Sequence, residues 1–203
     1  MNVLVYIVLC AELATLIVAL SYVKKHKQKY FKYFVAYAAV IFIVEYIANM
    51  VVTKDNGYIY DIYTFFEFNL VAIIYYHLNK EKFSLNAIKY MTIIFNVIYL
   101  LSFYFEFIQR YIVVTLAFML SSFMILYFKE LLDSNKIVNY RKNLSFWITT
   151  GMLFYYLTTI PFLALVYITD LKNDDASFII RLITIATHLC FITGIIWSRK
   201  KVN

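Results

Sequence analysis

Residues 3–32 read VLVYIVLCAELATLIVALSYVKKHKQKYFK. Residues 3–22 are almost wholly apolar, with a single carboxylate at Glu12, whereas residues 24–32 carry five lysines. A helix needs ~20 residues to cross a hydrocarbon core of ~30 Å. The stretch therefore predicts a transmembrane helix that ends in a short basic loop.

The same pattern recurs along the chain. Hydrophobic residues make up 64% of the 203 residues and charged residues 15%, with a mean hydropathy of +0.74. A soluble domain has about 45–50% apolar and about 25% charged residues. We predict seven transmembrane helices, at residues 3–22, 33–52, 58–78, 88–106, 111–128, 144–168 and 177–198.

These stretches are continuously apolar and do not alternate with a period of two, which favours helices over a β-barrel. The sixth stretch is long and contains Pro161, so a tilt or a kink is expected there. The longest gap, 129–143, is too short to fold independently. The sequence thus predicts an all-α, polytopic membrane bundle that forms a single domain over residues 1–203.

The basic residues divide unevenly between the two sides of this bundle, and 15 of the 19 lysines and arginines fall on one side. These are Lys24, Lys25, Lys27, Lys29, Lys32, Lys80, Lys82, Lys89, Lys129, Lys136, Arg141, Lys142, Arg199, Lys200 and Lys201. The other side holds Lys54, Arg110, Lys172 and Arg181. Because cytoplasmic loops carry the excess of Lys and Arg, we predict an outside N-terminus and a cytoplasmic C-terminus in the bacterial inner membrane.

The first basic loop mixes cations with aromatic residues, and its lysines are Lys24, Lys25, Lys27, Lys29 and Lys32. Such a loop can anchor the topology, dock on anionic headgroups, or contact RNA by charge and stacking. The anchor explains the loop and the net charge of +7 without a nucleic-acid partner. The partners expected are therefore the lipid bilayer and a cytoplasmic protein that contacts the basic loops. The 20 Tyr and 19 Phe are expected in interfacial belts and in helix packing.

Four ionisable residues lie deep in the predicted spans: Glu12, Glu45, Glu67 and His188. At 1.5 Å per residue, Glu12 and Glu67 are ~14 Å from the outer ends of their spans, and His188 is ~16 Å away. A charged group at the centre of a helix costs about 2.5–3.5 kcal/mol on insertion scales. Each of these residues therefore needs a structural or functional reason to be there.

Helical spacing extends this set into a predicted intramembrane polar network of Glu12, Glu45, Asn49, Asp61, Glu67, Arg181, Thr184 and His188. Tyr60 and Tyr63 share the face of Glu67. We expect Arg181 to pair with Asp61 or Glu45. His188 is expected to pair with Glu67 or Glu12. Such a network either forms a proton relay, an ion site or a polar pocket, or it holds the helices together.

Catalytic signatures are not evident in the sequence. The three histidines are too few and too scattered for a multi-histidine intramembrane hydrolase, and neither a P-loop nor a G-x-S-x-G sequence occurs. Cys10 and Cys190 are expected to be packing residues. We therefore expect no catalytic residues, no metal site and no cofactor.

Four segments resemble a group of small seven-span membrane proteins from Bacteroidota: Phe42–Glu45, Asn56–Phe68, Ser145–Gly151 with Tyr155, and Thr193–Lys200. That group often has an Asn midway along its last helix, where this chain has Thr184 and His188. The size and the wealth of Tyr, Phe, Lys and Asn are also similar to the membrane accessory protein of type VI-B CRISPR systems. This second resemblance implies a regulatory, non-enzymatic role in antiviral defence, in which the protein damps an RNA-guided, RNA-targeting effector.

The sequence thus favours a non-enzymatic accessory or regulatory protein of the inner membrane. The alternative is a small proton-coupled transporter or channel, or a membrane sensor subunit, that uses the buried Glu and His residues. An intramembrane enzyme that acts on lipid is the remaining hypothesis.

Overall fold

The computed structural model describes residues 3–50, 57–133, 142–169 and 174–198, and within these ranges the regular structure is helical throughout. The seven α-helices are α1 (Val3–Tyr22), α2 (Lys29–Met50), α3 (Gly57–Leu78), α4 (Lys82–Ser102), α5 (Glu106–Asp133), α6 (Leu144–Thr169) and α7 (Asp174–Trp197). Each predicted apolar stretch overlaps one of them over most of its length. The prediction of an all-α chain is therefore confirmed.

Five of these helices are long and apolar enough to cross a membrane. Their qualifying segments are Val3–Tyr22 of α1, Lys29–Asn49 of α2, Lys82–Ser102 of α4, Tyr111–Asp133 of α5 and Phe178–Trp197 of α7. Within the described residues, α3 and α6 are not in this group. Helix α6 nevertheless runs through Pro161 as one helix of 26 residues, and α3 has 22 residues. Both exceed the ~20 residues that a crossing requires.

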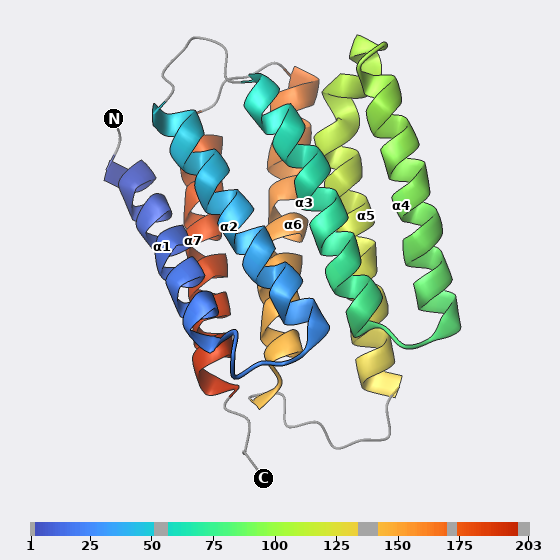
Figure 1. Ribbon diagram of the computed structural model, residues 1–203. Coiled ribbons are helices and arrows are strands. Elements are labelled where there is room, and N and C mark those ends of the chain that lie inside the picture. Colours follow the sequence, from blue (N-terminus) through green and yellow to red (C-terminus); the bar gives the residue numbers. More distant parts are fainter. Residues whose placement is uncertain (1–2, 51–56, 134–141, 170–173, 199–203) are drawn as a thin grey trace.

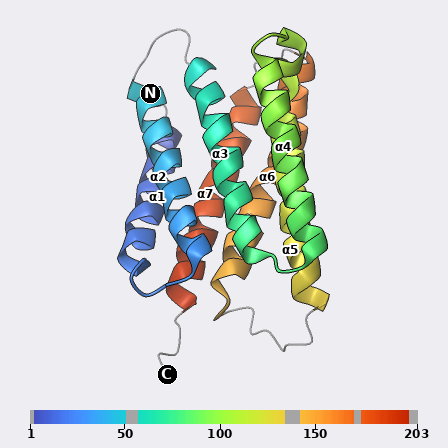
Figure 2. The ribbon, with the colours of Figure 1, turned by 45° about the vertical axis from the view of Figure 1, so that its right-hand side comes forward.

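Six helices form a closed ring in the order α1, α2, α3, α5, α6, α7, with α7 packed against α1. In Figure 1 the ring appears as two layers, with α1, α2 and α3 in front of α7, α6 and α5. Helix α4 lies outside the ring, packs on α3 and α5, and stands at the edge of the bundle in Figures 1 and 2. Helices α1, α3, α5 and α7 begin at the upper end of Figure 1, and we use "upper end" and "lower end" in this sense below.

The lower half of the ring is filled by large buried side chains. Phe34 of α2 meets Phe191 of α7 edge to face, with ring centroids 5.2 Å apart. On the opposite side, the Tyr75 hydroxyl of α3 contacts Met152 Sδ of α6 at 3.8 Å. All four side chains are buried almost completely, so this half contributes packing.

Helix α4 is attached to the ring by aromatic stacking. The rings of Phe68 on α3 and Phe95 on α4 are nearly parallel, with centroids 3.7 Å apart. The outer face of α4 leaves large apolar side chains exposed, among them Tyr90 and Leu100 at 64% and 62%. A surface of this kind suits lipid, because soluble monomers seldom expose contiguous apolar patches.

Candidate functional site

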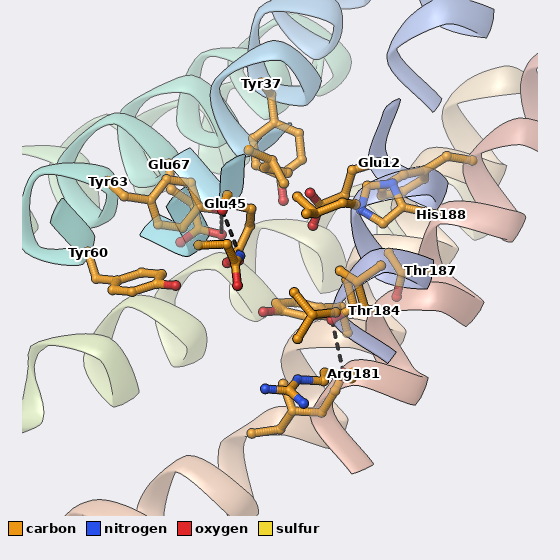
Figure 3. Close-up of a pocket in the computed structure, with 18 of the residues that line it drawn as sticks. Glu12, Tyr37, Glu45, Tyr60, Tyr63, Glu67, Arg181, Thr184, Thr187 and His188 are labelled. Carbon is orange, nitrogen blue, oxygen red and sulfur yellow. Dashed lines mark hydrogen bonds between the residues drawn. The ribbon is translucent and has the colours of Figure 1, made fainter. Parts of the chain in front are cut away.

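The upper half of the ring contains a cavity of about 420 Å³. All six ring helices contribute to its lining, and the polar residues shown in Figure 3 point toward one another from α1, α2, α3 and α7. The lining includes seven of the eight residues of the predicted polar network: Glu12, Glu45, Asn49, Glu67, Arg181, Thr184 and His188. Folding thus gathers side chains from distant parts of the chain into one polar space.

Glu67 is the most extensively hydrogen-bonded acid in the cavity. Its Oε1 atom accepts a 2.7 Å bond from the Tyr156 hydroxyl of α6 and a 2.9 Å bond from the Tyr63 hydroxyl, one turn away on α3. Tyr37 of α2 lies 3.5 Å from the Tyr156 oxygen. Because the Tyr156 proton is directed at Glu67, Tyr37 is the donor in that contact. Helices α3 and α6 therefore meet at one carboxylate oxygen, and α2 is joined to them through the Tyr37 hydroxyl.

Glu45 of α2 occupies a central electrostatic position. The amide of Asn49, one turn later, donates to the Glu45 backbone carbonyl at 2.7 Å and to its Oε2 atom at 3.4 Å. The charge of Glu45 interacts with those of Glu12 and Glu67, and with the opposite charge of Arg181. Glu45 thus connects the acids of α1 and α3 to the cation of α7.

Glu12 of α1 is only 1% exposed, yet its Oε2 atom has no hydrogen-bond partner among the described residues. A buried carboxylate oxygen without a donor costs about 1–3 kcal/mol or more. Figure 3 shows this side chain directed inward, beside His188. The cavity therefore contains an acceptor that the described part of the protein leaves unsatisfied.

His188 of α7 is 3% exposed and joins the last helix to the first. Its Nδ1 atom lies 2.9 Å from the hydroxyl of Thr15 on α1. Thr15 directs its own proton to the carbonyl of Ala11 at 2.9 Å, so it accepts from His188. The Nδ1 atom therefore carries a proton, and the contact closes the ring between α1 and α7.

Arg181 lies on the upper part of α7 and lines the same cavity. Within the described ranges, its guanidinium has no hydrogen-bond or ion-pair partner. The Thr184 hydroxyl donates to the carbonyl of Ile180 at 2.9 Å. The expected pairings of Arg181 with Asp61 or Glu45, and of His188 with Glu67 or Glu12, do not occur as direct bonds between these described side chains.

Asp61 is the one predicted network residue that does not line the cavity. Its Oδ2 atom accepts a 3.1 Å bond from the Gln109 amide of α5, and its backbone carbonyl accepts a 3.0 Å bond from the Tyr99 hydroxyl of α4. Six residues along a helix correspond to a rotation of about 240°. Asp61 therefore points away from the face that carries Glu67.

The basic loop lies at the lower end, away from the cavity. Lys24, Lys25, Lys27, Lys29 and Lys32 are all exposed. The Lys25 ammonium stands 4.6 Å from the ring centroid of Tyr22. Other predicted topology residues lie outside the described residues: Lys54, Lys136, Arg141, Lys172, Arg199, Lys200 and Lys201.

Three residues whose hydroxyl groups take part in these hydrogen bonds were not predicted from the sequence: Tyr37, Tyr156 and Thr15. Their hydroxyl groups lie midway along apolar helices, where each polar group has to find a protein partner. This requirement indicates that such hydroxyl groups form hydrogen bonds within the protein, but it does not identify the residues that they bond. Within the described ranges, no group of three or more His, Cys, Asp or Glu residues is arranged to hold a metal ion.

The chain matches no protein-family model, and no match to it was found among curated proteins or solved structures.

Proposed function

We propose that this protein spans the bacterial inner membrane seven times, binds a small polar solute in its upper cavity, and reports occupancy to a cytoplasmic partner without catalysing a reaction. The observation that carries this proposal is the buried Glu12 oxygen, which faces a polar cavity without a donor. Ionisable groups inside membrane bundles mark ligand or ion sites by default. A volume of about 420 Å³ lies within the ~300–1,000 Å³ range of small-molecule pockets.

Sensing accounts for the shape of the interior better than transport does. The polar lining occupies the upper half of the ring, whereas Phe34, Tyr75 and Met152 fill the lower half below it. The cavity is lined by residues of six helices, so binding of a solute there can alter how these helices pack. The exposed lysines at the lower end offer a surface for the partner that reads this change.

The orientation in this proposal follows from the basic loops and is tested by labelling thiols. In a variant whose native cysteines are replaced (Cys10→Ala, Cys190→Ala), one new cysteine is introduced at Lys27 or at Tyr104. Lys27 lies in the exposed basic loop, and Tyr104 is 84% exposed between α4 and α5 at the opposite end. An impermeant maleimide added to intact spheroplasts should label the Tyr104→Cys protein only. Labelling of Lys27→Cys in place of Tyr104→Cys would show that the protein has the opposite orientation.

Solute binding is tested by thermal unfolding of the purified protein in detergent across a library of polar metabolites. A ligand at 100 times its Kd stabilises the folded state by ~2.7 kcal/mol. We expect a stabilising solute whose effect falls in Glu12→Gln, Glu45→Gln or Glu67→Gln. It should persist in Asp61→Asn, the matched control outside the cavity. The proposal is wrong if no solute stabilises the protein, or if all three cavity variants respond like the wild type.

The same solute distinguishes sensing from transport. Proteoliposomes should bind it without accumulating it. Time-dependent uptake that Glu67→Gln abolishes and Asp61→Asn preserves would make the protein a transporter.

We also propose, from the resemblance to the type VI-B accessory protein, that the cytoplasmic partner is an RNA-guided effector contacted through the basic loop. The exposure of all five lysines at one end of the bundle supports this choice of surface. Replacement of the five lysines by glutamine should abolish damping of effector activity in an RNA-knockdown assay. If a correctly inserted variant still damps the effector fully, the effector is not contacted through the basic loop.

A further inference from the structure

We propose that the solute is a small zwitterion, with an ammonium group held by the acids of α1, α2 and α3 and an acidic group held by Arg181 of α7. This inference rests on the proposed function and specifies the chemistry of the same cavity. It follows from two groups of opposite kind, a Glu12 oxygen and the Arg181 guanidinium, that have no hydrogen-bond partner among the described residues and belong to side chains lining one cavity.

The acidic side of the cavity has free acceptors. Both tyrosine hydroxyls that bond Glu67 use the same oxygen, Oε1, so its other oxygen remains for another donor. The Oε2 atom of Glu12 is buried and without a partner in the described structure. An ammonium group carries three N–H donors and no acceptor, so it suits a site lined by carboxylate and phenol oxygens.

The basic side has a free donor. Arg181 lines the cavity, and no described residue forms a hydrogen bond or ion pair with its guanidinium. Arginine inside a membrane bundle normally pairs with an acid or with backbone carbonyls. Its planar fork binds a carboxylate or a phosphate through two parallel hydrogen bonds.

Charge balance favours one ligand that carries both groups. A simple cation would leave the guanidinium without a partner. A simple anion would have to bind beside three acids, Glu12, Glu45 and Glu67, of which Glu45 already interacts with each of the other two. A zwitterion satisfies both ends and adds no net charge to an interior where charges interact strongly. The gap between Arg181 and the acids is the space that such a molecule would bridge.

The size of the cavity restricts the ligand to a small molecule. Its volume of about 420 Å³ is near the lower limit of small-molecule pockets, and part of its wall is apolar, from Val8, Ile41, Val113 and Phe191. These side chains suit a short hydrocarbon spacer between the two charged groups.

The test uses three length-matched series on the purified full chain: ω-amino acids from glycine to 6-aminohexanoate, n-alkylamines, and n-alkylcarboxylates. Isothermal titration calorimetry measures Kd for each. We expect at least one ω-amino acid to bind at least about tenfold more tightly than its matched amine and carboxylate, since each charge-assisted contact corresponds to about tenfold or more in Kd.

Variants of the cavity residues test which side chains bind the ammonium end of the ligand and which bind the acidic end. Arg181→Gln should weaken the ω-amino acid about tenfold and leave alkylamine binding within about twofold, whereas Arg181→Lys should retain part of the affinity. Glu12→Gln should weaken the ω-amino acid and the amine together. Lys129→Met, which removes a lower-end cation, is the control and should leave all three series unchanged. Thermal midpoints and elution profiles establish that each variant is folded, and Arg181→Lys serves if Arg181→Gln does not fold.

Several results would overturn the zwitterion. One is amine binding that equals ω-amino acid binding and is insensitive to Arg181→Gln. Another is carboxylate binding that is insensitive to Glu12→Gln. If the three series fail but another polar metabolite stabilises the protein, the zwitterion is excluded and the proposed function stands. If no solute of any kind binds, both are excluded.

Discussion

Tyr156 on α6 donates a 2.7 Å hydrogen bond to Glu67 on α3, across the interior of the ring and between residues 89 positions apart in sequence. Helices α3 and α6 are not neighbours in the ring order. The bond therefore spans the bundle at the boundary between the packed lower half and the polar upper half. With the bond from Tyr63, it fixes the position of the carboxylate that has the most hydrogen bonds in the cavity.

Replacement of Glu67 should depend on whether an acceptor is retained. Glu67→Ala leaves two buried hydroxyls without their acceptor and should lower the free energy of unfolding by about 1–3 kcal/mol. Glu67→Gln keeps an amide oxygen and should cost less than about 1 kcal/mol. Equilibrium unfolding in mixed detergent and SDS measures both. Equal losses in the two variants would contradict the role assigned to the Oε1 atom.

The bond between His188 and Thr15 should contribute to closing the ring. Thr15→Val removes the acceptor and should cost about 0.6 kcal/mol, the average for interhelical hydrogen bonds in a membrane protein, with about 1.7 kcal/mol as the upper limit. Thr193→Val is the matched control, because the Thr193 hydroxyl bonds only the Leu189 carbonyl of its own helix. A double-mutant cycle with His188→Phe should give a non-zero coupling energy. Additive losses would show that the contact contributes nothing.

Gly194 should tolerate no side chain, because a Cβ atom there would overlap the Trp147 side chain of α6. At Gly151, a Cβ atom would lie 2.7 Å from the Phe191 ring. Gly194→Ala should lower stability by about 1–3 kcal/mol, as overpacking does. Ala186→Val on the exposed face of α7 is the control and should be nearly neutral. The thermal midpoint in detergent measures the difference, and a neutral Gly194→Ala would contradict this close approach of α6 and α7.

The positions of the helices could be predicted from the sequence, because a helix that crosses the membrane needs an apolar stretch as long as the hydrocarbon core is thick. The ends of the helices were predicted less accurately. The fourth helix was predicted at 88–106 and is found at Lys82–Ser102, and the fifth was predicted at 111–128 and extends over Glu106–Asp133. Backbone hydrogen bonding continues into polar sequence beyond the hydrocarbon, where Lys and Glu are good helix formers. Conversely, Phe103–Phe105 are apolar but fall in a turn.

The residues of the site could be predicted only in part, because hydropathy does not show which helices are neighbours in the bundle. Glu12, Glu67 and His188 were singled out by their depth, but their bonding partners are set by the ring order. Tyr156 lies on a helix without Asp, Glu, Lys, Arg or His, so no charged residue nearby in the sequence drew attention to it. Asp61 could have been excluded from the sequence, since it lies about 240° around the helix from Glu67.

The amide pair of Asn69 and Asn96 should behave as a unit. Each side-chain amide donates to the other's oxygen at 3.1 Å, between α3 and α4. Asn96→Leu alone leaves the Asn69 amide oxygen without its donor, whereas the amide nitrogen keeps its bond to the Phe65 carbonyl. This variant should cost about 0.6 kcal/mol, with about 1.7 kcal/mol as the upper limit. The double variant Asn69→Leu with Asn96→Leu should recover most of that loss, because both polar groups are removed together. A double variant that is as unstable as the sum of the single variants would contradict the pairing.

The contact of Thr15 with His188 has a consequence for how the chain is made. These residues lie 173 positions apart, so α1 enters the membrane long before α7 is synthesised. During that interval Glu12 and Thr15 face their surroundings without the helix that encloses them. The ring closes only when α7 arrives, so the arrival of α7 ends the exposure of these groups during biogenesis. A chain that stalls before α7 would keep an open, polar seam, a feature by which membrane quality control could recognise it.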